Sequence, residues 1–369
     1  MSKSKDETSS AHIKKNIKDR IKFTRDGIEN PNDIEYGGSF ATISLDNDLD
    51  PEKFISNLDF QINKITKNDM EVEVKGIDAP IANALRRILI SEIPTMAIDK
   101  AILYQNTSVM HDEVLCHRLG LLPVLVDPNF FVSKAANEEF DESNSIKFRL
   151  HVKCSRKPEY RHKKYEQLLD LNPEDYLEHS TVYADDLEWI PMGNQAQQFE
   201  KVPAKILHNK IIITKLRENQ EVECELYCSK NIGRIHAKWS PVSTAFYRLL
   251  PDIQFNEPVV GEDAEELKQI CPMGVFDIED SIVAGNSSKV AYVKNLKACT
   301  MCRECIRDGK FDQKIDLGKQ RNHYIFTVES VGVIPPDLLF AKAMEVLKDK
   351  VQHYITYFNS LKKLKKKSL

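Results

Sequence analysis

The sequence has no long hydrophobic run, only 2 tryptophans and no large excess of charge of one sign. No apolar stretch approaches the roughly 20 residues that a membrane-spanning helix needs, so we expect no contact with a membrane. The net charge is -4, from 52 basic and 56 acidic residues. Because dedicated nucleic-acid binders carry a strongly basic surface, we expect any contact with nucleic acid to be local or indirect.

Short motifs of several enzyme classes are also missing. Gly233 and the pair Gly37–Gly38 lie outside any glycine-rich phosphate-binding frame, and the sequence contains neither a GxSxG nucleophile elbow nor an HExxH zinc motif. We therefore predict that the chain is not an enzyme. The first residues, MSKSKDETSSAH, contain no apolar stretch and no secretory cleavage site, so we expect the cysteines to stay reduced.

The two ends of the chain differ in composition from the rest. Residues 1–35 are rich in Lys, Asp, Glu, Ser and Asn, which predicts a disordered tail. Residues 363–369 form a short basic tail, which is more typical of a solvated chain end than of a phosphate-binding site. Between the tails, the composition is that of a folded protein with a sizeable core.

Alternating apolar and polar residues in FQINKITKNDMEVEVKG predict a β-hairpin with one buried face. That face would be made of Ile62, Ile65, Val72 and Val74. A helix follows, because Asp78 can cap its first turn and apolar residues recur at helical spacing until Pro94. Its other side carries Asn83, Arg86 and Arg87, which form either a solvated face or a contact with another chain.

The last part of the chain predicts a long helix. Pro335 and Pro336 break the preceding strand, and Asp337 can cap the helix that follows. Its apolar residues recur at heptad spacing over about five turns. This seam consists of Phe340, Met344, Leu347, Val351, Tyr354 and Phe358. Periodicity alone does not distinguish a core-facing seam from a partner interface.

Three of the 8 cysteines lie close together in CTMCREC. Cys299, Cys302 and Cys305 have the spacing C-x2-C-x2-C, and Cys271 upstream is followed by a proline, so the parts of a bacterial-type ferredoxin run are present in reverse order. These four thiolates predict a single [4Fe–4S] cluster. Zinc is an alternative, because four thiolates also suit a tetrahedral ion, and a metal-free site is the third possibility.

The segment GIDAPIANALRRILISEIPTMAIDKAILYQNTSVMHDEVLCHRLGLLPV resembles the signature of the α-like subunits of multisubunit RNA polymerases. HAKWSPVSTAFYRLLP and RNHYIFTVESVGVIPP extend the resemblance over residues 57–360. Within this family, SPVSTAFYRLLP looks like the larger α-like subunit that RNA polymerases I and III share, rather than its polymerase II counterpart or the archaeal D subunit.

The resemblance implies an α+β fold with a discontinuous dimerisation domain, in which residues 57–104 and 318–362 form an antiparallel sheet with two packed helices. A mostly-β domain over 105–256 and a small ferredoxin-like, cysteine-containing insert over 257–316 lie between them in the sequence. The C-terminal seam would then contact a small α-like subunit in a heterodimer. The residues implied to face the two largest polymerase subunits are Asn83, Arg86, Arg87, His117 and Arg118.

The function that the resemblance implies is non-catalytic assembly. The heterodimer would form a platform for the largest and second-largest subunits in the nucleus, in both nucleolus and nucleoplasm, and would meet DNA only indirectly. Two alternatives stay open. The chain is either the equivalent subunit of another polymerase class or an iron–sulfur redox protein that uses its four clustered cysteines for electron transfer or oxidative sensing.

Overall fold

The structure is a computed structural model, and it describes residues 20–29, 50–135, 137–163, 167, 171–283 and 286–367. The chain divides into two compact units. The first is drawn from Met1–Lys64, Glu71–Asn83 and Phe246–Thr327, and the second from Ile65–Met70, Ala84–Ala245 and Val328–Leu369. Helices and antiparallel sheets occur together, which confirms the α+β class. None of the described helices has the length and apolar character needed to cross a membrane.

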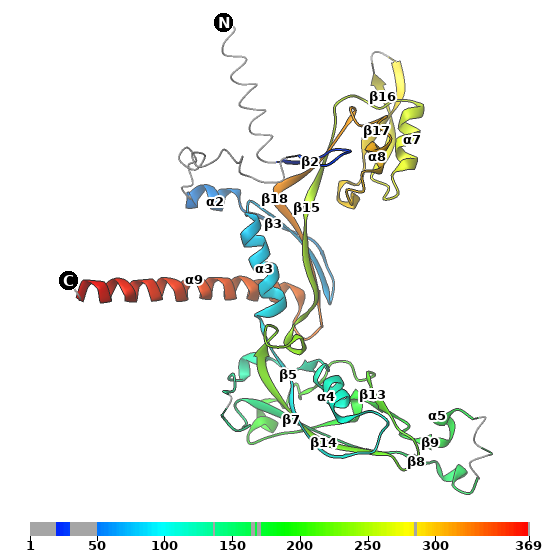
Figure 1. The fold of residues 1–369 in the computed structure, drawn as a ribbon, viewed down its shortest axis with the longest axis vertical. Coiled ribbons are helices and arrows are strands. Elements are labelled where there is room, and N and C mark those ends of the chain that lie inside the picture. The colour runs from blue at the N-terminus through cyan, green and yellow to red at the C-terminus, as the bar shows by residue number, and fades with distance from the viewer. Residues whose placement is uncertain are drawn as a thin grey trace. The chain divides into compact units, whose positions relative to one another are not determined.

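The first unit is built on a six-stranded sheet with the order β2-β1-β18-β4-β3, in which β15 also pairs with β18 (Figure 1). The strands are β1 Arg20–Phe23, β2 Ile28–Glu29, β3 Asp59–Ile65, β4 Asp69–Lys75, β15 Val242–Phe255 and β18 Ile315–Ser330. A short helix, α2 Pro51–Asn57, precedes β3. The sheet therefore joins strands from the beginning and the end of the chain, as the resemblance implied.

The β3–β4 hairpin forms, but the prediction of its buried face is wrong for β3. Val72 and Val74 on β4 are buried, whereas Ile62 and Ile65 on β3 are exposed. The physical reason is position, because β3 is the last strand in the order of the sheet and only β4 flanks it.

The predicted disordered tail is also wrong in part. Residues 20–29 form β1 and β2, and β1 pairs antiparallel with β18 from Arg20 opposite Gln320 to Phe23 opposite Leu317. Composition did not reveal this strand, because its stability comes from pairing with a segment about 300 residues away. Residues 1–19 and 30–35 of the predicted tail lie outside the described residues.

Gly76 lets the chain leave β4 next to a backbone carbonyl. Its φ is +84°, and a Cβ at this position would lie 2.2 Å from the carbonyl oxygen of Asn57. The Gly76 N–H donates to the carbonyl of Asn322 at 2.8 Å, which ties the turn to β18. Only glycine combines this left-handed conformation with such a close approach.

We predict that Gly76→Ala lowers the free energy of unfolding of the first unit by about 2–4 kcal/mol, because it adds a backbone clash to a strained φ. Thermal denaturation measures the loss. The matched control is Gly27→Ala, since a Cβ at Gly27 meets nothing within 4 Å. Equal melting temperatures for the two variants would contradict the steric argument.

The four cysteines of the predicted cluster lie in the same unit, on short elements with an apolar core of their own. These elements are α7 Glu262–Ile270, β16 Phe276–Val283, β17 Asn286–Val293, η7 Leu296–Ala298 and α8 Glu304–Arg307. β16 and β17 form an antiparallel pair. The core of this part contains Val259, Leu267, Val275, Phe276, Ile306 and Phe311.

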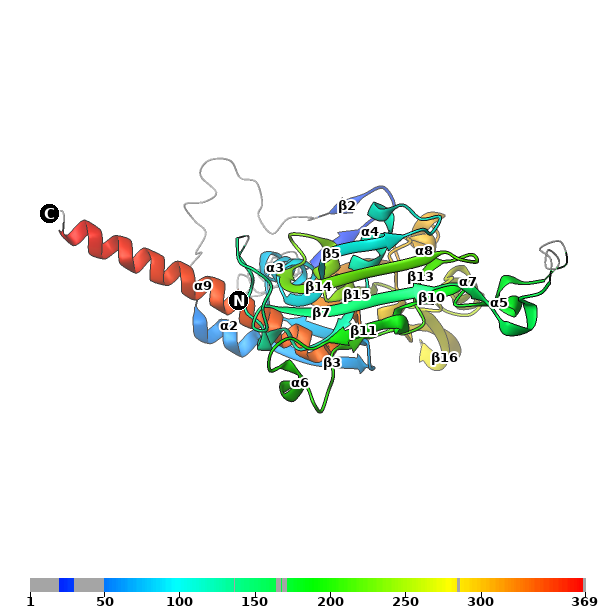
Figure 2. The ribbon, with the colours of Figure 1, turned by 90° about the horizontal axis from the view of Figure 1, so that it is seen from below.

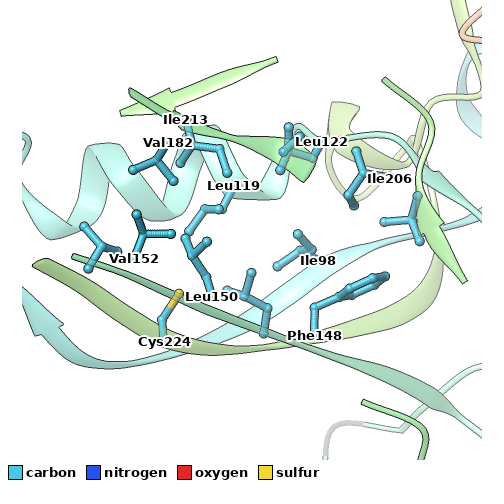
Figure 3. Close-up of a cluster of buried hydrophobic side chains, with 14 of the residues drawn as sticks. Ile98, Leu119, Leu122, Phe148, Leu150, Val152, Val182, Ile206, Ile213 and Cys224 are labelled. Carbon is cyan, nitrogen blue, oxygen red and sulfur yellow. The ribbon is translucent and has the colours of Figure 1, made fainter. Parts of the chain in front are cut away.

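The second unit contains a four-stranded antiparallel sheet with the order β11-β7-β14-β5. Its strands are β5 Pro94–Asn106, β7 Ser145–Lys153, β11 Leu187–Ile190 and β14 Glu221–Ile232, and the helix α4 Asp112–Gly120 packs against β5. In Figure 3, Leu119 and Leu122 point toward Ile98, Phe148 and Leu150 of the sheet. Cys154, Cys224 and Cys228 are buried in this unit as small apolar residues.

Short elements complete the second unit. The strands are β6 Val124–Leu125, β8 Ser155–Arg156, β9 Leu177–Glu178, β10 Thr181–Tyr183, β12 Lys205–Ile206 and β13 Ile212–Lys215. The short helices are η2 Pro128–Phe130, η3 Pro158–Tyr160, α5 Pro173–Tyr176, η5 Ala184–Asp186, α6 Gln195–Gln198 and η6 Ala237–Trp239. The short strands form three two-stranded sheets, in which β12 pairs with β6, β8 with β9 and β10 with β13.

Two amphipathic helices form where the sequence predicts them. α3 covers Ala79–Ser91, between Asp78, whose backbone carbonyl accepts from the Ala82 N–H at 3.1 Å, and Pro94. α9 covers Pro336–Lys367 and is one unbroken helix in Figure 2. The basic tail predicted for 363–369 continues this helix as far as Lys367, and its last two residues lie outside the described part of the chain.

Candidate functional site

The seam of α9 changes character along the helix. Phe340 is buried, with 5 % of its surface exposed, and Leu347 is half-buried. Beyond them, the exposed fraction rises to 51 % at Val351, 61 % at Tyr354 and 58 % at Phe358. Further apolar side chains exposed on this helix are Leu338, Met344, Ile355, Tyr357 and Leu361. The first part of α9 therefore packs within its own unit, while the second part presents an uncovered apolar stripe.

Such a stripe is costly to leave in water. Contiguous exposed apolar patches are rare on monomeric proteins and usually mark a protein–protein contact. An ion pair between Lys350 and Glu92, the residue after α3, fixes the beginning of the exposed part of the helix. Exposure shows that the second part of the seam does not pack within the described part of the chain, and its contact with a partner stays a prediction.

The polar residues on α3 and α4 lie in different environments. On α3, Arg87 is exposed, whereas Asn83 and Arg86 are half-buried. On α4, His117 is exposed. Arg118 donates its Nε–H to the Ile213 carbonyl at 2.9 Å and its Nη2–H to the Ile212 carbonyl at 2.6 Å.

Arg118 therefore has a structural role that the sequence did not predict. Two of its N–H groups hold α4 against β13 within the second unit. A guanidinium has five N–H donors, so Arg118 keeps donors for a partner contact, but its orientation is set from inside the unit. Facing a large subunit stays a prediction for this residue and for the other four.

The four predicted cysteine ligands meet at one pocket of the first unit. Cys271, Cys299, Cys302 and Cys305 all line it, together with apolar residues. Cys271 directly follows α7, Cys299 directly follows η7, and Cys305 lies in α8. The Val275 N–H donates to Cys271 Sγ at 3.4 Å, as backbone amides do to sulfur ligands of metal clusters.

Burial and mutual proximity both act on these thiols. Burial, with smaller contributions from the neighbouring thiols of Cys299, Cys302 and Cys271, raises the pKa of Cys305 to about 12. Burial likewise raises the pKa of Cys299, with Cys302 and Cys271 contributing. Cys302 is the exposed member of the set. Residues separated by up to 34 positions in the sequence are thus brought together as the spacing predicted.

The sulfur atoms of the four cysteines are not all as close to one another as they would be around a single tetrahedral ion. Among the described residues, three ligand atoms within 4.8 Å of one another occur at His151, Glu221 and Glu223, and not among the four cysteines. Those three side chains lie on β7 and β14, where Lys153 and Arg149 already pair with the two carboxylates at 3.3 and 2.9 Å. We therefore assign no metal site to them.

A buried carboxylate connects the cysteine-bearing segment to the sheet of the same unit. Glu73 on β4 accepts from Asn63 Nδ2 at 2.7 Å, contacts His323 Nε2 at 2.9 Å and forms an ion pair with Lys297. Lys297 lies in η7, two residues before Cys299. Its backbone carbonyl accepts from Arg248 Nη1 at 2.7 Å. The segment that leads into Cys299 is therefore fixed to β4, β15 and β18.

This network predicts acid sensitivity. Burial raises the pKa of Glu73, but the hydrogen bonds from Lys297, Asn63 and His323 outweigh it and lower the pKa from 4.5 to about 2. A carboxyl whose pKa is lower in the folded state stabilises the fold above its unfolded pKa. That contribution, about 2–3 kcal/mol after screening of the half-exposed Lys297, is lost as the pH falls from about 4.5 to about 2.

The measurement is the melting temperature of the wild type and of Glu73→Gln between pH 6 and pH 3. The wild type should be more stable at pH 6, and the difference should shrink below about pH 4.5. Glu71→Gln is the control, because Glu71 contacts Asn63 at 3.0 Å but lacks the ion pair. A difference that stays constant with pH would exclude Glu73 as the source.

Residues 71–351 match the family described as the RNA polymerase Rpb3/Rpb11 dimerisation domain. The chain belongs to this family. Relatives that are similar to this chain are named as subunits of DNA-directed RNA polymerases. The chain is 39 % identical over 340 residues, covering 92 % of this chain and 95 % of the relative, to the human "DNA-directed RNA polymerases I and III subunit RPAC1".

Two other relatives extend the comparison. The Saccharomyces cerevisiae "DNA-directed RNA polymerases I and III subunit RPAC1" is 38 % identical, with 87 % of this chain and 96 % of the relative covered. The "DNA-directed RNA polymerase subunit Rpo3" of Methanosphaera stadtmanae is 31 % identical, with 78 % and 93 % covered. The resemblance to the subunit shared by polymerases I and III is thereby confirmed.

Proposed function

We propose that this chain is the larger α-like subunit of RNA polymerases I and III and acts as a non-catalytic assembly subunit. The support is similarity along nearly the whole length of relatives that carry this name, and a lower identity to the archaeal subunit. A nuclear location follows from this assignment, in the nucleolus for polymerase I and in the nucleoplasm for polymerase III. Contact with DNA is indirect, in keeping with the net charge of -4.

One acidic run bears on the non-catalytic assignment. Asp46, Asp48 and Asp50 have the D-x-D-x-D spacing that can hold Mg²⁺ in nucleotidyl transfer. Asp46 and Asp48 lie outside the described residues. The Asp50 side chain accepts from the backbone N–H groups of Glu52 and Lys53, so Asp50 is the N-cap of α2. The described member of the run is thus engaged in helix capping.

The exposed apolar stripe of α9 is the observation that carries the proposal. A helix that buries its first turns and exposes Val351, Tyr354 and Phe358 is suited to pair with a second helix-bearing subunit. We propose that the small α-like subunit covers this stripe. The pair then presents Asn83, Arg86 and Arg87 of α3, with His117 and Arg118 of α4, to the two largest subunits. Arginine is suited to this role because it can bind carboxylates with two parallel hydrogen bonds.

The test is co-expression of the full chain with candidate small α-like subunits, followed by purification and mass determination. We expect a 1:1 complex with the subunit that polymerases I and III use and much weaker pairing with the polymerase II counterpart. Stronger pairing with the polymerase II counterpart would show that the chain is the equivalent subunit of another polymerase class. A chain that remains a monomer with every candidate would overturn the assembly role.

We also propose that the four cysteines hold one [4Fe–4S] cluster. Four thiols converge on one pocket, with a backbone N–H directed at one sulfur. Zn–S bonds of about 2.3 Å would draw the sulfurs to roughly 3.8 Å from one another, whereas a four-iron core holds its thiolates further apart. The role of the cluster would be structural, since ligation adds its free energy to folding.

A further inference from the structure

The β1–β2 hairpin lies against the cysteine site. In the pairing of β1 with β18, Phe23 is opposite Leu317 and Ile21 is opposite Lys319. Directly opposite residues of an antiparallel pair have their side chains on the same face, so Phe23 lies on the face that carries Leu317. Leu317 is buried and lines the pocket that the four cysteines share. The first described strand of the chain therefore runs beside the strand that supplies Leu317 to this pocket, with Phe23 on the same face as Leu317.

Three contacts support this placement. Phe23 packs against the same apolar cluster as three of the four cysteines. Lys319 Nζ lies 5.4 Å from the centre of the Phe23 ring, which fixes the ring on this face. Arg303, which lies in the cysteine-bearing loop and lines the pocket, donates Nη1–H to the Thr24 carbonyl at 3.4 Å. The turn of the hairpin therefore contacts the cysteine-bearing loop directly, and the Phe23 ring packs against the apolar cluster that the cysteines also contact.

The other face of β1 holds the hairpin in place. Arg20 Nε lies 2.5 Å from Asp252 Oδ2, and Arg20 Nη1 lies 2.5 Å from Asp316 Oδ2. Arg20 Nη2 also donates to the Asp316 carbonyl at 2.9 Å. The guanidinium fits because residue 318 is glycine, where a Cβ would lie 2.4 Å from Arg20 Nε. One half-buried arginine thus clamps the hairpin to β15 and β18.

The turn of the hairpin is closed by its own hydrogen bonds. The Thr24 N–H donates to the Gly27 carbonyl at 2.9 Å, and the Gly27 N–H donates to Thr24 Oγ1 at 3.2 Å. The short strand β2 then pairs with β1, with Ile28 opposite Phe23. The hairpin is thus an ordered element between two anchors, Arg20 on one face and Arg303 at the turn.

We propose that the hairpin Arg20–Glu29 is a wall of the cysteine site, with Arg20 as its anchor and Phe23 as the side chain that keeps solvent from Cys299 and Cys305. This inference rests on the proposed role of the four cysteines as cofactor ligands. The exposed Cys302 and the exposed Met273 mark the side on which the pocket is open to solvent. Reagents approach the cysteines from that side, and opening of the hairpin adds a second route.

The test is the alkylation rate of each cysteine in the full-length protein. The protein is reduced, freed of metal with a chelator and treated with iodoacetamide, and each cysteine is quantified by peptide mass spectrometry. Phe23→Ala and Arg20→Ala should each raise the rates at Cys299 and Cys305 by about tenfold and leave that at Cys302 unchanged. Lys22→Ala is the matched control, because Lys22 lies on the same strand and is exposed in its ion pair with Glu29.

The outcomes separate the hairpin from the cofactor. Unchanged rates at Cys299 and Cys305 in Phe23→Ala would overturn the proposal. If Arg20→Ala also exposes Cys224 and Cys228, which are buried in the second unit, that variant has unfolded. The proposal is then tested by Phe23→Ala alone, because this variant keeps the ion pairs of Arg20. Iron and sulfide in the untreated protein are measured separately. If the protein contains no iron but the hairpin still slows alkylation of Cys299 and Cys305, the proposed cluster is refuted and the proposed shielding by the hairpin is supported.

Discussion

The double substitution V351D/Y354D should abolish copurification of the small α-like subunit. Both side chains are exposed on α9 of the isolated chain, and the proposed interface buries them. Burial of one large apolar side chain is worth about 1.5–3 kcal/mol, so the pair contributes about 3–6 kcal/mol to binding. Two carboxylates at the same place add a desolvation cost. We expect at least about a 100-fold weaker complex, measured by pull-down and by analytical ultracentrifugation of the purified proteins.

Thr356→Asp is the matched control on the same helix. With 3.6 residues per turn, Thr356 lies about 140° around the helix from Val351 and so points away from the seam. It introduces one carboxylate, where V351D/Y354D introduces two, at a nearby height along α9. Circular dichroism should show full helicity for both variants. Undiminished copurification of V351D/Y354D, or an equal loss with the control, would show that this stripe is not the contact with the partner.

Replacement of Cys271, Cys299, Cys302 and Cys305 together by serine should remove all bound iron and sulfide. Because ligand binding free energy becomes folding free energy, and structural metal sites contribute on the order of 10 kcal/mol, the segment 257–316 should also become sensitive to protease. The effect should extend along Lys297 to Glu73 and weaken binding of the partner. Metal and sulfide analysis, limited proteolysis and copurification measure the three consequences.

Cys116→Ser is the control for this experiment, since Cys116 is half-buried and belongs to the second unit, whereas the four cysteines belong to the first. Zinc in place of iron in the wild type would replace the cluster by a single ion and leave the structural role intact. A quadruple variant that resists protease and binds its partner as well as the wild type would remove any structural role from the site.

Strong local signals in the sequence predicted the helices and the meeting of the cysteines. Asp78 directly precedes α3 and Pro94 follows it, while α9 begins at Pro336 with Asp337 inside its first turn and not at the predicted cap position, because start and stop signals act within a few residues. The meeting of the cysteines was predictable for a similar reason, because three of the four lie within seven residues of one another in the sequence. The apolar seam of α9 was visible, but its division into a buried first part and an exposed second part depends on what packs against it.

Features that depend on distant pairing were not predictable from local sequence. Ile62 has the pattern of a buried position, yet it is exposed because β3 is at the edge of the sheet. Arg20 lies in a polar segment that composition assigns to a tail, and only Asp252 and Asp316 turn it into an anchor. Glu73 reads as the solvent-facing residue of an alternating strand, and its burial follows from three partners on other elements.

The order in which the strands of the first unit are made has a consequence in the cell. β4 ends at Lys75 and β18 begins at Ile315, a separation of 315 − 75 = 240 residues. At roughly 5–20 residues per second, a ribosome needs about 12–48 seconds to supply the missing neighbour. Throughout that time, Val72 and Val74 lack β18, one of the two strands that β4 pairs with in the finished sheet. Nascent chains of this protein should therefore depend on chaperones until translation is almost complete.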